Sequence, residues 1–154
     1  MNKARREFLT QASAAVIATL ASSSHAFAFS QEFYEGVAGF IGEASSEVFY
    51  KLSQWLTQRE NLDKNDSDKV YTVIRQEPWG NEHVVQIYGK IAPLIAKKNK
   101  TLDLAKLIDN QFFNEGEKWF ISHLLLTWYL GIYYHEERED QRILYETALM
   151  HNIS

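Results

Sequence analysis

The spacing of apolar residues along the chain predicts helices throughout and no sheet. From residue 31 to residue 56, apolar side chains recur every three or four positions, which is the period of a helix with one buried face. Gly36, Gly39 and Gly42 interrupt the first part of this run and weaken its helical tendency. We therefore expect the better-formed helix at residues 45–59, where Glu47 and Lys51 are spaced as an i, i+4 pair.

Three further helices are expected before residue 115. The first follows a polar break, is capped by Asp66 or Ser67 and runs to about residue 76. The second starts near Glu82 and is kinked or ended by Pro93. The third is a short helix at residues 101–109 that has Thr101 as its cap.

Residues 115–134 form the most apolar predicted helix, because apolar side chains extend almost all the way round it. Such a helix lies either in the centre of a bundle or under another chain. The tail, residues 135–154, begins with a charged run and then becomes apolar. The whole pattern predicts an all-α fold: one small helical-bundle domain at residues 29–154, with an extended or partly helical C-terminal tail.

The first 28 residues have the three parts of an export signal peptide. Arg5 and Arg6 form a positive start, a short and weakly apolar run follows, and small residues allow cleavage after Ala26 or Ala28. The apolar run is about half of the ~20 residues that a membrane span requires. We therefore expect a periplasmic protein without a transmembrane segment in its mature chain.

The type of signal is indicated by the residues after the arginine pair. Phe8 and Leu9 follow it at the second and third positions, which is typical of a twin-arginine signal. That pathway exports proteins that have already folded, often together with a partner. An ordinary secretory signal is the alternative.

Charge and cysteine content exclude several function classes. The chain has 16 Lys and Arg and 20 Asp and Glu; its first 28 residues hold three of the basic and one of the acidic residues, so 13 and 19 remain, a net charge of −6. An acidic domain lacks the basic face that nucleic acid requires and the polybasic patch that binds anionic lipid. Without cysteine the chain has no disulfide, thiolate metal site or cysteine nucleophile.

The histidines do not form a metal-binding motif. His135 begins an H-E-x-x-H pattern, but Glu139 stands where the second histidine is required. His83 and His123 have no second ligand three or four positions away, and we interpret both as packed or surface residues.

Other catalytic signatures are also missing from the sequence. Glu115 and Glu117 are not on one helix face and suit the N-terminus of a helix. There is no nucleophile elbow and no phosphate loop. We therefore expect no catalytic, cofactor-binding or metal-binding residue in this chain.

Aromatic residues are abundant, with 4 Trp, 8 Tyr and 9 Phe. Trp and Tyr are enriched in the centres of protein interfaces, and core packing is the alternative for each. The candidate contacts with a partner lie in the second half of the chain: Trp119, Trp128, Tyr129, Gly131, Tyr133, Tyr145, Leu149 and Met150.

Two parts of the chain resemble one protein family. Residues 49–63, FYKLSQWLTQRENLD, are similar to its L-S-x-x-L-T-G-x-x-x-L-D segment. Residues 128–132, WYLGI, and 144–150, LYETALM, are similar to its W-Y-x-G-hydrophobic and Y-x-x-A-L-M segments. The family is the small (gamma) subunit of membrane-bound, FAD-dependent sugar and polyol dehydrogenases, which include the sorbitol, fructose, gluconate and glucose enzymes.

The resemblance implies a complex of three kinds of subunit. The large subunit carries FAD and the active site, and a c-type cytochrome passes electrons to the membrane quinone pool. The small subunit has no redox group; it carries the twin-arginine signal for the large subunit and supports its folding. This chain departs from the family at Gln58, where the family has glycine. If that glycine is a left-handed helix cap, the helix at residues 45–59 is expected to run on past Gln58 here.

We therefore expect a non-catalytic accessory subunit of a periplasmic, membrane-associated dehydrogenase complex. Its partners are the large flavoprotein, the twin-arginine machinery and a c-type cytochrome, and FAD belongs to the large subunit. The alternative is a free-standing periplasmic helical protein that binds a small ligand or acts as an enzyme. For that function, His83, His123 and Glu115 would have to meet in one pocket.

Overall fold

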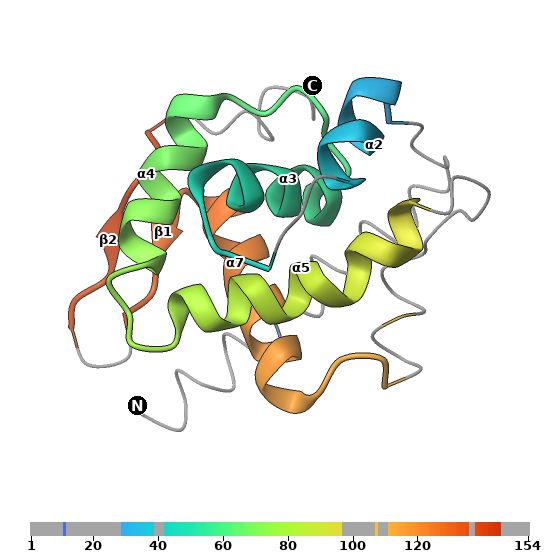
Figure 1. Cartoon of the computed structure of the whole chain (residues 1–154). Coiled ribbons are helices and arrows are strands. Elements are labelled where there is room, and N and C mark those ends of the chain that lie inside the picture. Colours follow the sequence, from blue (N-terminus) through green and yellow to red (C-terminus); the bar gives the residue numbers. More distant parts are fainter. Residues whose placement is uncertain are drawn as a thin grey trace. The chain divides into compact units, whose positions relative to one another are not determined.

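In the computed structural model (Figure 1), residues 29–38, 42–96, 111–135 and 138–145 are described, together with Gln11 and Leu107. The chain divides into two compact units, His25–Asp103 and Leu104–Ser154 with Met1–Ser24. Several predicted features lie outside the described residues: Arg5, Arg6, Phe8, Leu9, both cleavage positions, most of the helix at 101–109, Leu149 and Met150.

The described residues form five helices and one small hairpin, which confirms the predicted all-α class. The α2–α5 unit contains α2 (Gln31–Ala38), α3 (Ser46–Thr57), α4 (Lys64–Ile74) and α5 (Gly80–Ala96). The α7 unit contains α7 (Glu115–Leu130) and the strands β1 (Ile132–Tyr133) and β2 (Gln141–Arg142).

Helix α3 is the central element of the α2–α5 unit, since it packs against α2, α4 and α5 (Figure 1). Its apolar face, with Phe49, Leu52 and Leu56, is fully buried. Each such side chain contributes about 1.5–3 kcal/mol relative to an exposed position. The neighbouring helices supply the rest of the core: Phe33, Val37, Val70, Ile74, Val84, Ile87, Tyr88 and Ile91.

Helices α3 and α4 both begin at capping side chains. The Ser45 Oγ accepts a hydrogen bond from the Val48 N–H at 3.1 Å, and the Asp63 carboxylate accepts one from the Asp66 N–H at 3.0 Å. The prediction that Asp66 or Ser67 caps α4 is therefore wrong. The first turn of α4 largely faces solvent and is therefore polar, like the loop before it. This similarity in composition is why the helix was predicted to start too late.

Helix α5 starts before the predicted Glu82 and continues beyond Pro93, so the proline does not end it. A proline inside a helix leaves the carbonyl four residues earlier, here that of Gly89, without its helical donor. Both Gly89 and Pro93 are exposed, so water can bond to this carbonyl. The helix therefore tolerates Pro93 on its solvent face.

Helix α7 is capped at both ends by residues of its own local sequence. Asn114 and Glu117 form a capping box, in which Asn114 Oδ1 accepts from the Glu117 N–H at 2.8 Å and the Glu117 carboxylate accepts from the Asn114 N–H at 2.9 Å. At the other end Gly131 is left-handed, with φ 70°. The helix is therefore shorter than the predicted residues 115–134. Among the described residues no helix, α7 included, has the length and apolar character to cross a bilayer.

Beyond Gly131 the chain forms an antiparallel hairpin, which corrects the prediction that no sheet is present. The register pairs Ile132 with Arg142 and Tyr133 with Gln141. Strands of two residues are too short to show the apolar–polar alternation by which strands are recognised in a sequence.

Candidate functional site

His83 is a packed residue on α5. Its Nδ1 lies 2.9 Å from the carbonyl oxygen of Trp79, and its ring meets the Trp79 ring edge-on at 5.7 Å between centroids. These contacts fix the ring one turn from the start of the helix.

Trp119, His123, Tyr133 and His135 form a continuous row of rings that joins α7 to β1 and the residues after it. The Trp119 and His123 rings are stacked at 5.1 Å between centroids, and Tyr133 meets His123 and His135 edge-on at 4.8 and 4.7 Å. His135 Nε2 lies 3.2 Å from Gln141 Oε1 on β2. Since His123, Tyr133 and His135 are buried, this row is core packing of the α7 unit.

The two acidic residues of the first turn of α7 act at its N-terminus, as predicted. Glu117 is 1% exposed and serves the capping box. Glu115 is exposed and pairs with Lys118 at 3.3 Å. Within the part of the chain that is described, no three His, Cys, Asp or Glu residues lie close enough together to hold a metal ion.

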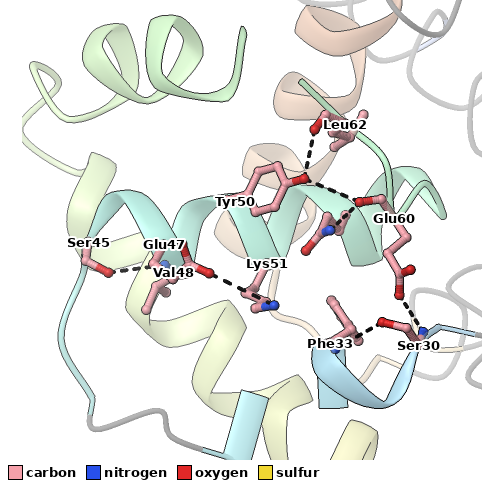
Figure 2. Close-up of polar contacts among 10 residues, drawn as sticks. Ser30, Phe33, Ser45, Glu47, Val48, Tyr50, Lys51, Glu60 and Leu62 are labelled. Carbon is pink, nitrogen blue, oxygen red and sulfur yellow. Dashed lines mark hydrogen bonds and ion pairs between the residues drawn. The ribbon is translucent and has the colours of Figure 1, made fainter. Parts of the chain in front are cut away.

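The loop between α3 and α4, residues 58–63, makes hydrogen bonds to α3 and to the segment before α2 (Figure 2). Gln58 is left-handed, with φ 55°, and its side-chain Nε2 donates to the Trp55 carbonyl at 2.5 Å. The Glu60 carbonyl then accepts from Gln54 Nε2 and from the Tyr50 hydroxyl, the latter at 3.4 Å. The loop thus folds back on α3, the helix that it has just left.

The Tyr50 hydroxyl also joins this loop to the start of α4. Its single O–H donates chiefly to the Leu62 carbonyl at 2.8 Å, and the longer Glu60 contact shares the same proton. Burial, followed by the nearby carboxylates of Glu47, Glu60 and Asp63, raises the pKa of Tyr50 above its ordinary value. The phenol therefore remains protonated and keeps its donor role at any physiological pH.

The Glu60 carboxylate holds the segment that precedes α2 (Figure 2). It accepts the Ser30 N–H, and the Ser30 Oγ in turn accepts from the Phe33 N–H at 3.3 Å. The Phe29 ring stacks on the Phe33 ring at 4.0 Å between centroids. The chain just before α2 is thereby tied to the α3–α4 loop, a contact that our reading of the sequence did not include.

Lys51 on α3 makes a further contact with α2. Its Nζ lies 5.2 Å from the centroid of the Phe33 ring and 4.0 Å from the Glu47 carboxylate. A Cβ at Gly36 would lie only 2.6 Å from the Lys51 Cε, so the absent side chain of Gly36 gives the lysine room to cross α2.

Comparison with known proteins identifies the family. A family model described as "Membrane bound FAD containing D-sorbitol dehydrogenase" matches residues 3–154. The chain belongs to this family. No curated protein and no solved structure matches the chain.

The segment at residues 49–63, by which the sequence resembles the sorbitol dehydrogenase family, is the one that forms α3 and the loop after it. It supplies the buried face of the central helix and the Tyr50, Gln54 and Glu60 contacts of the loop. In this member of the family, the motif therefore specifies a helix and the turn that ends it.

The expectation that α3 runs on past Gln58 is wrong. The helix ends at Thr57, and Gln58 itself takes the left-handed conformation that glycine adopts most easily. Its backbone N–H bonds to the carbonyls of Gln54 and Trp55, so the cap geometry is kept without glycine. A residue with a Cβ bears a cost of about 1–2 kcal/mol in this conformation.

The structure divides the candidate partner contacts into buried and exposed residues. Trp128 and Tyr133 are each 1% exposed, and Gly131 is the buried C-cap of α7. Trp119 and Tyr129 are half-buried. Tyr145 is 83% exposed, and Leu130, which sequence reasoning did not select, is 39% exposed.

The strained cap predicts that Gln58→Gly stabilises the protein. The left-handed cost is removed, and it is offset in part by the greater freedom of glycine in the unfolded chain and by the loss of the Nε2 hydrogen bond to Trp55, so we expect a gain of up to about 0.5 kcal/mol over the unsubstituted protein and of about 0.5–1 kcal/mol over an alanine variant. The measurement is urea denaturation of the protein. The control is Gln58→Ala, which keeps a Cβ and loses the Nε2 hydrogen bond to Trp55, and it should give no gain. A glycine variant less stable than the alanine variant would contradict the assignment of Gln58 as a strained cap.

Proposed function

We propose that this chain is a non-catalytic accessory subunit of a periplasmic, membrane-associated, FAD-dependent sugar or polyol dehydrogenase complex. It carries the twin-arginine signal at Arg5 and Arg6 and supports the folding and export of the large flavoprotein subunit. The observation that supports the proposal is the family match over residues 3–154, a range that includes the proposed signal and the helical region.

The sequence supports the placement of FAD in another subunit. Dinucleotide-binding domains place a G-x-G-x-x-G turn between a strand and a helix of a parallel sheet. The glycines of this chain do not have that spacing, and its described strands are two residues long and antiparallel. A c-type haem likewise attaches through a C-x-x-C-H motif, and this chain has no cysteine. In the proposed complex the haem therefore belongs to the cytochrome subunit.

The exposed apolar residues of the α7 unit support a partner surface there. Leu130 and Tyr145 are the two large apolar side chains exposed among the described residues. The Gly131 carbonyl accepts hydrogen bonds from the Ile143 and Leu144 N–H groups at 2.8 and 3.1 Å. Gly131 directly follows Leu130, and Leu144 directly precedes Tyr145, so these bonds bring the two exposed residues into the same region. In the proposal, Leu130 and Tyr145 form one contact surface for the large subunit, to which Trp119, Tyr129, Leu149 and Met150 add.

The export role predicts the fate of both subunits when the arginine pair is changed. In cells that also express the large subunit, the double substitution Arg5→Lys and Arg6→Lys should leave both proteins in the cytoplasm, because the flavoprotein has no signal of its own in this proposal. Immunoblots of periplasmic and cytoplasmic fractions measure this, with Lys3→Arg as the control that leaves the pair intact. A large subunit that still reaches the periplasm would rule out the carrier role.

The contact surface predicts that Tyr145→Ala weakens the complex. A central interface aromatic contributes about 1–2 kcal/mol or more, so we expect about tenfold weaker binding of the large subunit. The thermal stability of this chain should not change, because Tyr145 is exposed. Tyr145→Phe keeps the ring and is the matched control. Unaltered affinity of the alanine variant, measured by titration against the large subunit, would remove Tyr145 from the interface.

A further inference from the structure

Glu60 presents a negative charge to the first described residues of the α2–α5 unit. Its carboxylate accepts the Ser30 N–H, and the Phe29 ring stacks on Phe33 immediately beside this bond. A backbone amide is a neutral donor and does not require a charged acceptor. The charge of Glu60 has no role in the function proposed above.

The nitrogen of Phe29 lies close to the same carboxylate. It is three covalent bonds from the nitrogen of Ser30, so the two atoms are within about 4 Å of each other. In the uncleaved chain the Phe29 nitrogen is an uncharged amide. After cleavage of the bond between Ala28 and Phe29, it is an ammonium, and opposite charges at about 4–6 Å stabilise each other.

We propose that Glu60 is the binding site of the mature N-terminus: the export signal is removed between Ala28 and Phe29, and the Glu60 carboxylate then binds the new ammonium of Phe29. In this hydrolysis by a signal peptidase, one water adds across the peptide bond. The Ala28 carbonyl carbon gains the water oxygen and leaves as a carboxylate, and the Phe29 nitrogen gains both water protons and becomes an ammonium. The inference rests on the proposed export of the chain.

The two cleavage positions that the small residues allow differ in where they place the new ammonium relative to the Glu60 carboxylate. Cleavage after Ala26 would place the ammonium on Phe27, two residues further from Glu60. Cleavage after Ala28 places it next to the Ser30 contact, where it joins the residue before α2 to the α3–α4 loop by an ion pair. Removal of the signal thus strengthens the contact that holds α2 in the unit.

The first test is the mass of the N-terminal peptide of the chain purified from the periplasm with its partner. The inference predicts that the mature chain begins at Phe29. A chain that begins at Phe27 or elsewhere, or an exported chain that retains its signal, would overturn it. A full-length chain found only in the cytoplasm would instead contradict the proposed export itself, so the two failures are distinguishable.

The second test measures the charge state of the new amino group. An ammonium bound by Glu60 has a raised pKa, so less of it is the reactive free amine, and a neutral amine-reactive acylating reagent labels it slowly near neutral pH. In the purified complex, Glu60→Gln should speed labelling of the N-terminus about threefold or more, because a shift of ~0.5 in the pKa changes the free-amine fraction by that factor.

The glutamine variant keeps an acceptor oxygen for the Ser30 N–H, so the fold is retained and thermal unfolding checks this. The control Glu139→Gln removes the same charge from an exposed position of the α7 unit and should leave the labelling rate unchanged. Equal labelling rates for Glu60→Gln and the unsubstituted protein would overturn the assignment of Glu60 as the ammonium site.

Discussion

The left-handed turn at Gln58 is the constraint on which the rest of the α2–α5 unit depends. It reverses the chain at the end of the central helix, so that Glu60 faces Tyr50 and Gln54 of that helix and Asp63 is placed to cap α4. The same loop then holds Ser30 through the Glu60 carboxylate. One strained residue thus positions the helix after it and the segment before α2. Burial of the apolar face of α3 offsets the free-energy cost of that strain.

The sequence predicted the helices well where one face is buried. It predicted them poorly where a capping side chain or a left-handed residue sets the position at which a helix starts or ends. The spacing of Leu52 and Leu56 located α3, because burial of that face is the main stabilising term. The start of α4 was misplaced because the exposed first turn looks like a loop. The hairpin was missed because its two-residue strands depend on Gly131 and on the buried ring row rather than on a pattern of their own.

The candidate site was predictable only in part, for related reasons. Tyr145 is exposed, whereas Trp128 and Tyr133 are buried, and composition alone does not separate these cases. The Glu60–Ser30 contact joins residues thirty positions apart and has no sequence signature. By contrast, the family was recognisable from residues 49–63, 128–132 and 144–150 taken together with the signal-like first 28 residues, and the first of these segments forms the central helix and its turn.

In the proposed function, this member of the sorbitol dehydrogenase family serves as a subunit of a larger flavoprotein complex. Affinity capture of this chain, co-expressed with the large flavoprotein subunit proposed as its partner, is the decisive measurement. We expect the large subunit to elute with this chain in a fixed ratio, with flavin absorbance in the same fraction. Elution of this chain alone as a stable monomer, with the flavoprotein active in the unbound fraction, would contradict it.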